Sequence, residues 1–212
     1  MRPTVGPRAI REQWVAVDAR GRTDRENTRV GTSAVIRELA PPEVRGRIAG
    51  LADVLIDCVE GGSSVGFMLP LARKRAEAFW THVADSAEAG ERIVLIAEQP
   101  TPDRPAEVLG TVQVIFASYD NQPHRADIAK MLVRRSARRQ GLGERLLRAA
   151  EAAALRARRT LLVLDTVPGT PAERLYLRCG WTPVGIVPGF ALMPDGRECD
   201  TRFFYKRLEA VA

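Results

Sequence analysis

The pattern of hydrophobic and polar positions predicts alternating helices and strands from residue 34 onward. Apolar residues recur at helical spacing over residues 41–59 and again over residues 71–89, so each stretch predicts one amphipathic helix. Glycines follow both stretches, at Gly61 and Gly90, where helices commonly end. The same spacing returns over residues 143–158, which predicts a third long helix.

Short apolar stretches between these helices predict strands. They cover residues 34–39, 92–99, 108–117, 126–133 and 160–166, followed by a hairpin of residues 182–187 with 201–207. The stretches from residue 92 to residue 133 predict an antiparallel meander. Residues 160–166 form a continuous apolar run, which is typical of a parallel strand buried on both faces. A short helix over residues 171–179 ends at Gly180. The chain is therefore expected to be mixed α/β.

Composition narrows the class of protein. A chain of 212 residues with 45% hydrophobic residues can form one domain with a sizeable core. Its net charge of +6 suits an anionic cofactor or simple solubility. Part of this charge gathers between residues 134 and 139, where four arginines could serve a cofactor that carries phosphates. The sequence contains no nucleic-acid-binding motif, so nucleic acid is not an expected partner.

Residues 1–33 differ from the rest, because arginines are scattered there with little periodicity. We expect a mobile arm before a domain of residues 34–212; a nucleic-acid-binding tail and a later translation start are the alternatives. The three cysteines have no metal-ligand or disulfide pattern, which predicts reduced thiols and no metal. No apolar run approaches the roughly 20 residues of a membrane helix, so a cytoplasmic protein without membrane contact is expected.

The junction between the strand of residues 126–133 and the following helix could bind a phosphate. It has the order Arg138-x-x-Gly141-x-Gly143. Glycines allow backbone amides to approach an anion closely, and the helix N-terminus adds partial positive charge. Taken alone, glycines that serve only to turn the chain are an equally good interpretation.

A second motif follows at residues 172–181, with the sequence AERLYLRCGW. Together the two motifs resemble those of the GNAT superfamily of N-acetyltransferases. Residues 60–68, 161–166 and 188–197 are similar to the branch that contains the tabtoxin resistance protein. The resemblance covers roughly residues 34–208.

This resemblance implies a mixed central sheet whose fourth and fifth strands splay apart, with helices on both faces. It also implies acetyl-CoA as co-substrate. The backbone of Met131, Leu132 and Val133 would pair with the pantetheine arm. The pyrophosphate would lie on the turn formed by Arg138, Arg139, Gln140, Gly141, Leu142 and Gly143. Tyr176 would protonate the departing thiolate; packing against its neighbours is its alternative role. Members often carry asparagine where this chain has Gly169, so one side-chain contact to the cofactor is missing.

Two carboxylates are candidates for handling the acceptor amine. Asp127 and Asp165 lie on the two strands expected to diverge, and each is flanked by apolar residues. Carboxylates there could attract an ammonium group and accept its proton. A solvated charge at Asp127 and a turn residue at Asp165 are the structural alternatives. His124 is a further candidate base, and the loop of residues 61–68 is expected over the acceptor site.

The sequence thus predicts an acetyl-CoA-dependent N-acetyltransferase. The expected acceptor is a primary amine of a small molecule, such as a toxin, an antibiotic or an amino-acid-like compound, which attacks directly in a ternary complex. This acceptor class would make the protein a resistance enzyme. An enzyme acting on protein N-termini or lysines is the alternative, and a non-catalytic acyl-CoA-binding protein is the alternative from another class. The oligomeric state, monomer or homodimer, stays open.

Overall fold

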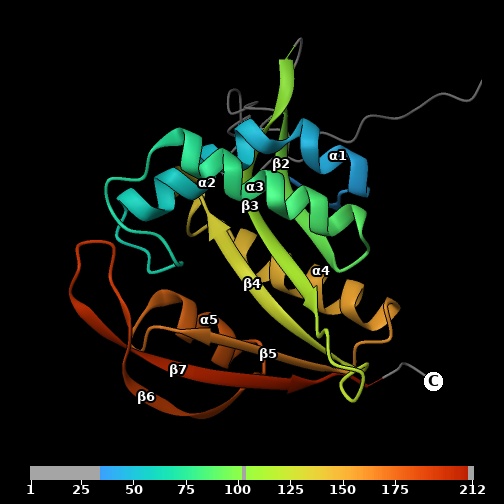
Figure 1. The fold of residues 1–212 in the computed structure, drawn as a ribbon, viewed down its shortest axis with the longest axis vertical. Coiled ribbons are helices and arrows are strands. Elements are labelled where there is room, and N and C mark those ends of the chain that lie inside the picture. Colours follow the sequence, from blue (N-terminus) through green and yellow to red (C-terminus); the bar gives the residue numbers. More distant parts are fainter. Residues whose placement is uncertain (1–33, 102–103, 210–212) are drawn as a thin grey trace, which may run out of the picture. The chain divides into compact units, whose positions relative to one another are not determined.

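The computed structural model describes residues 34–101 and 104–209 (Figure 1). The arm predicted for residues 1–33 lies outside the described residues. Within them, a seven-stranded sheet has the order β1-β2-β3-β4-β5-β7-β6. Its strands are β1 (Val35–Glu38), β2 (Arg92–Thr101), β3 (Arg104–Phe116), β4 (Arg125–Val133), β5 (Leu161–Thr166), β6 (Thr182–Leu192) and β7 (Glu198–Arg207).

The strand pairing confirms the predicted topology. Strands β1 to β4 form an antiparallel meander, and β4 pairs with β5 in parallel. The connection between β4 and β5 contains a 3-10 turn, η1 (Arg135–Ala137), and helix α4 (Leu142–Arg156). Beyond β5, the chain forms α5 (Pro171–Arg178) and then the β6–β7 hairpin, in which β7 pairs with β5.

Helices cover both faces of the sheet, as predicted. The helices α1 (Pro41–Gly46), α2 (Ile48–Glu60) and α3 (Arg73–Glu88) bury apolar residues against one face. On the opposite face, α4 and α5 share a second core with residues from β2, β3, β4, β5 and β7. Figure 1 shows the two layers, with the N-terminal helices on one side of β3 and β4 and α4 on the other.

The single helix predicted for residues 41–59 is wrong, because the chain forms two helices there. Arg47 separates α1 from α2 with φ −107° and ψ 0°, outside the helical region. It follows Gly46, a residue with poor helix propensity. The Arg47 guanidinium donates to the carbonyl oxygen of Ala106 on β3, at 3.3 Å. Tertiary contacts of this kind override the apolar periodicity, which continues across the break.

The expectation that β5 is buried on both faces is also wrong. Leu162 and Leu164 are buried among the residues packed under α4 and α5, but Asp165 is exposed. The apolar positions that alternate with these leucines are only partly buried. The described residues that pack against α1, α2 and α3 come from β2, β3 and β4, with none from β5. One face of β5 is therefore open.

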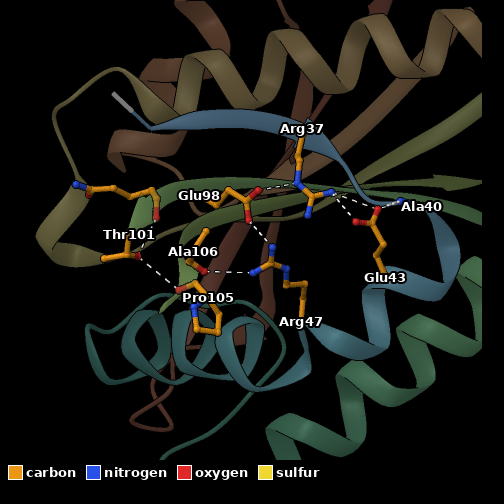
Figure 2. Close-up of polar contacts among 9 residues, drawn as sticks. Arg37, Ala40, Glu43, Arg47, Glu98, Thr101, Pro105 and Ala106 are labelled. Atoms are coloured by element: carbon orange, nitrogen blue, oxygen red, sulfur yellow. Dashed lines mark hydrogen bonds and ion pairs between the residues drawn. The ribbon is translucent and has the colours of Figure 1, made fainter. Parts of the chain in front are cut away.

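A buried carboxylate joins the N-terminal segment to the sheet (Figure 2). Glu98 on β2 is 8% exposed. Its Oε1 accepts a hydrogen bond from Arg37 Nε at 2.6 Å, and its Oε2 lies 2.9 Å from Arg47 Nη2. Arg37 also pairs with Glu43, whose Oε2 accepts from the backbone N–H of Ala40 at 2.8 Å. Glu98 thus fixes both β1 and the α1–α2 junction.

We expect Glu98→Gln to lower the free energy of unfolding by about 2 kcal/mol. The change leaves two arginines facing a neutral amide. The loss of stability stays below that for a fully buried ion pair, because both guanidinium groups retain some contact with water. Urea unfolding measures the effect, with Glu107→Gln as a control at an exposed ion pair. A Glu98→Gln variant as stable as the control would show that the network contributes nothing.

Candidate active site

The parallel strands β4 and β5 pair at one end and separate at the other. Their register contains the pairs Arg125–Leu161, Ala126–Leu162 and Asp127–Val163, and the structure shows no pairing beyond Asp127. Each strand continues for several residues past this point. The divergence is visible in Figure 1, where the two strands spread apart toward their carboxyl ends. The splayed fourth and fifth strands predicted from the sequence are thus confirmed.

A bulge in β4 lies where the strands diverge. The register of β4 against β3 shifts between the pairs Thr111–Leu132 and Gln113–Ala129, and Lys130 has φ 49°. A lysine in the left-handed region is uncommon, and such strain is frequent at functional sites. After the bulge, Met131, Leu132 and Val133 have no strand partner on the β5 side. One carbonyl there is already occupied, because Val133 accepts from Arg138 Nε at 3.1 Å.

The turn after η1 presents unbonded amides. Arg139 and Gly141 have φ values of 62° and 76°, so the chain turns twice through the left-handed region. Gly141 is the N-cap of α4 and supplies no capping side chain. Within the described part of the chain, the structure shows no hydrogen bond to the amides of Gly141, Leu142 or Gly143. Such amides at a helix N-terminus form an anion-binding site.

Two features of this turn could not be inferred from the sequence. Gly143 does not turn the chain, because it lies inside α4, where an added Cβ would meet Leu175 Cδ2 at 3.2 Å. Its small size instead lets α4 pack closely against α5. Arg134 and Arg135 are also not free for a phosphate. Arg135 Nε donates to Asp57 Oδ1 at 2.8 Å, and Arg134 pairs with Asp53 and Glu107.

The helix α5 places Tyr176 in the core beneath the divergent strands. Thr170 caps the helix by accepting from the Glu173 N–H at 3.3 Å, and Pro171 opens its first turn. The ring packs 6.1 Å, centroid to centroid, from both Trp181 and Phe204. Tyr176 is 5% exposed, and burial raises the pKa of its phenol, with a smaller contribution from the Asp165 carboxylate. The phenol is therefore protonated at neutral pH.

Asp165 and Asp127 lie on the same face of the sheet, on opposite sides of the divergence. Asp165 is at the solvent boundary, yet the surrounding protein atoms raise the pKa of its carboxyl by desolvation. Lys130 opposes this shift, and Asp127 adds to it. The two carboxylates have different environments. Asp127 binds Arg125 through both oxygens, at 2.8 and 3.0 Å, whereas the described residues provide no hydrogen-bond partner for the Asp165 carboxylate.

The structure does not bring every candidate to this site. His124 precedes β4 at its paired end, where its carbonyl oxygen accepts from the N–H groups of Thr160 and Leu161. It therefore lies at the opposite end of the strand from the divergence. Gly169, where the predicted asparagine contact to the cofactor is missing, has φ 75°, and its N–H donates to Glu173 Oε2 at 2.6 Å. Its contribution here is structural.

The loop between α2 and α3 reaches the β6–β7 hairpin. Ser64 Oγ donates to the carbonyl oxygen of Leu192 at 3.0 Å, and the Leu69 N–H donates to the carbonyl oxygen of Pro194 at 2.9 Å. These contacts connect the α2–α3 loop with the end of β6 and the turn that follows it. Figure 1 shows the loop and the hairpin approaching each other beside the ends of β4 and β5.

Sequence reasoning missed one residue on this face, Lys130. Its Nζ lies 5.4 Å from the centroid of the Phe79 ring on α3. A Cβ added to Gly66, in the α2–α3 loop, would lie 3.9 Å from the same nitrogen. A lysine within the apolar stretch of residues 126–133 is the signal that could have identified it.

Other site classes find no support among the described residues. The structure shows no group of three or more histidine, cysteine, aspartate or glutamate residues that could hold a metal ion. In the same part of the chain, no helix is long and apolar enough to cross a membrane.

Comparison with known proteins gives a family match over part of the chain. Residues 90–183 match the family model described as an acetyltransferase (GNAT) domain. This part of the chain is therefore similar to a GNAT acetyltransferase domain, and the enzyme class is that of the N-acetyltransferases. The matched range runs from the start of β2 to the start of β6, so it includes the turn at Gly141, the divergent strands and Tyr176.

Several solved acetyltransferase structures share this fold. They include yncA of Salmonella typhimurium, determined with its cofactor acetyl-CoA (18% identity, TM-score 0.67, 85% of this chain and 97% of that chain). A phosphinothricin acetyltransferase of Sinorhizobium meliloti in complex with acetyl-CoA has 16% identity and a TM-score of 0.64, over 83% and 89% of the two chains. A ribosomal-protein-alanine N-acetyltransferase of Brucella melitensis has 20% identity and a TM-score of 0.63, over 82% and 99%. At these identities the likeness establishes the fold.

Proposed function

We propose that this protein transfers the acetyl group of acetyl-CoA to a primary amine of a small molecule. The observation that carries the proposal is the divergence of β4 and β5, with an uncapped helix N-terminus on one side and Asp165 and Tyr176 at the gap. Structures of the same fold from Salmonella typhimurium and Sinorhizobium meliloti contain acetyl-CoA. The phosphinothricin acetyltransferase among them supports a small acceptor.

In this proposal the cofactor is bound mainly by backbone groups. The amides of Gly141, Leu142 and Gly143 receive the pyrophosphate, and the side chains of Arg139 and Gln140 at the same turn lie exposed beside it. The unpaired edge of β4 at Met131 and Leu132 receives the pantetheine amides. Because Arg138 occupies the carbonyl of Val133, this arginine positions the strand end in addition to contributing charge.

The chemical step is direct attack within a ternary complex. The neutral amine nitrogen forms a bond to the thioester carbon, the carbon–sulfur bond breaks, and the thiolate of CoA leaves. Asp165 attracts the ammonium form of the acceptor and accepts the proton that the amine loses. Tyr176, held in its protonated form, donates to the sulfur as negative charge develops there. Asp127, already bound to Arg125, acts only through its effect on Asp165.

An acceptor screen tests the proposal. The purified protein is mixed with acetyl-CoA and single amines: amino acids, β-lactam-like toxins, aminoglycosides, polyamines, and peptides with free N-termini. Release of free CoA thiol is followed, and each product is identified by mass. We expect thiol release above the acceptor-free rate, with an added acetyl group on small amines. Acetylation of the peptides alone would assign the protein to the class that modifies protein N-termini or lysines, and thiol release without any acetylated product would contradict the transfer.

The phosphate turn makes a separate prediction about binding. We expect Gly141→Val to weaken acetyl-CoA binding about tenfold or more, because a β-branched residue resists a φ of 76° and the turn must move its amides. Isothermal titration calorimetry measures the dissociation constant. Gly90→Val is the matched control. Gly90 has φ 74° and equally open surroundings, but it follows α3 and is distant in sequence from the turn at Gly141. Equal affinities in the two variants would move the phosphate site elsewhere.

A further inference from the structure

Lys130 brings a positive charge to the acceptor face of the sheet. It belongs to the bulge of β4, so its side chain starts where β4 leaves β5. Its ammonium group lies against the ring of Phe79 and beside Gly66 of the α2–α3 loop. That loop is joined to the β6–β7 hairpin through Ser64 and Leu69. The ammonium is thus positioned between α3, the loop and the sheet.

This ammonium has no strong partner in the protein. Across residues 34–101 and 104–209, the structure shows neither a hydrogen bond nor an ion pair from Lys130 Nζ; the Phe79 ring is the contact it does show. Desolvation lowers the pKa of Lys130, Asp165 opposes the shift, and Arg92 adds to it. A cation–π contact is worth only about 0.5–2 kcal/mol. Removing an ammonium group from water costs free energy when no carboxylate contacts it, and a bound anion offsets this cost.

The neighbouring charges also favour an anion at this point. Arg92 lies near enough to affect Lys130, and its own donors are used by Ser86 Oγ at 2.8 Å and Gln113 Oε1 at 2.9 Å. Arg92 therefore adds positive potential without supplying a free donor from these two nitrogens. Asp165 is the carboxylate that interacts with Lys130, and the two groups do so at a distance, without forming an ion pair.

We infer that Lys130 binds an acidic group of the acceptor, so that the preferred acceptors carry a carboxylate, phosphonate or similar anion together with the primary amine. The inference rests on the proposed function and narrows its acceptor class. Asp165 receives the ammonium end of such a molecule and Lys130 receives the acidic end. The spacing of the two side chains across the divergence then orients the amine toward the thioester. Lys130 is a specificity-determining residue, because it strengthens the binding only of amines that also carry an acidic group.

The test compares matched pairs of acceptors in wild type and in Lys130→Met. The probes are L-methionine with L-methioninamide, β-alanine with β-alaninamide, and 2-aminoethylphosphonate with ethanolamine. For each pair, kcat/KM of the acid is divided by kcat/KM of the partner that lacks the acidic group. Comparing this ratio between the two proteins cancels the difference in amine basicity between acid and amide. Methionine has a similar length and also lacks the freedom of glycine, so the strain at φ 49° is matched.

We expect wild type to prefer the acid of at least one pair, and Lys130→Met to lower that ratio about tenfold or more, mainly through KM. Lys130→Arg should restore part of the preference, which a purely structural role would not predict. Affinity for acetyl-CoA and the melting temperature are measured for both variants to separate recognition from misfolding. Acetylation of amines with no acid preference, or an unchanged ratio in a folded Lys130→Met variant, would overturn this inference and leave the transfer activity intact. Absence of turnover with every amine would overturn both.

Discussion

Replacing Tyr176 with phenylalanine will lower the turnover number by about 10²-fold or more, while the dissociation constant for acetyl-CoA stays within about a factor of two. The phenol is buried and its pKa is raised, so it meets the departing thiolate as a proton donor. The thiolate develops its charge only as the carbon–sulfur bond breaks, and the missing donor therefore affects the transition state more than the bound cofactor. Steady-state kinetics with the best acceptor, together with calorimetric titration of acetyl-CoA, measure the two effects.

Disturbed packing around Tyr176 is the competing explanation for a lower turnover number. The ring contacts Trp181 and Phe204, and phenylalanine preserves these contacts, so the melting temperature should change little. Tyr119→Phe is the control, because Tyr119 is 67% exposed and lies in the connection between β3 and β4. A Tyr176→Phe variant that turns over as fast as this control would reduce Tyr176 to a packing residue.

The second large effect is expected at Asp165. Asp165→Asn should raise the acceptor KM about tenfold, because the ammonium form of the acceptor loses its charged partner. It should also remove the acidic limb of the rate-versus-pH curve. In wild type the carboxyl pKa is raised by desolvation, so the ionised base appears, and the rate increases, as pH rises through that raised pKa. Initial rates measured over a wide pH range, with acetyl-CoA saturating, test both expectations.

The melting temperature of Asp165→Asn separates an effect on catalysis from an effect on folding. Because the folded-state pKa lies above the unfolded one, the ionised carboxylate lowers stability as pH rises above the unfolded value. Asp165→Asn removes this cost, so its melting temperature at neutral pH should not fall. Asp120→Asn, in the exposed β3–β4 connection, is the matched control. An unchanged acceptor KM and pH profile in Asp165→Asn would mean that another group accepts the proton.

The fold could be predicted from the sequence where local patterns decide the structure. The antiparallel meander, the parallel crossover through α4 and the short α5 follow from periodicity and glycine stops. The break at Arg47 could not, since it depends on Glu98 and Ala106, which are distant in sequence. The open face of β5 likewise depends on which elements cover it, and an apolar run carries no information about that.

The candidate site, like the fold, could be predicted from the sequence only in part. Motifs predicted the local structure around Tyr176 and Gly141, because each residue belongs to a single strand–helix junction. Their roles stay predictions. The different environments of Asp127 and Asp165 could not be predicted, since they depend on the partner Arg125 and on burial. Lys130 was not among the predicted site residues. Its surroundings depend on a bulge of β4 that places its side chain beside Phe79 and Gly66. Such a meeting of three distant segments leaves no motif.

A crystal structure of the protein with acetyl-CoA tests the proposed site most directly. We predict that the pyrophosphate lies within hydrogen-bond distance of the amides of Gly141, Leu142 and Gly143, that the pantetheine arm runs along the free edge of β4, and that the thioester lies between β4 and β5 with its sulfur near the Tyr176 hydroxyl. A complex with the thioester outside this divergence, or with its sulfur far from Tyr176, would contradict the proposed mechanism.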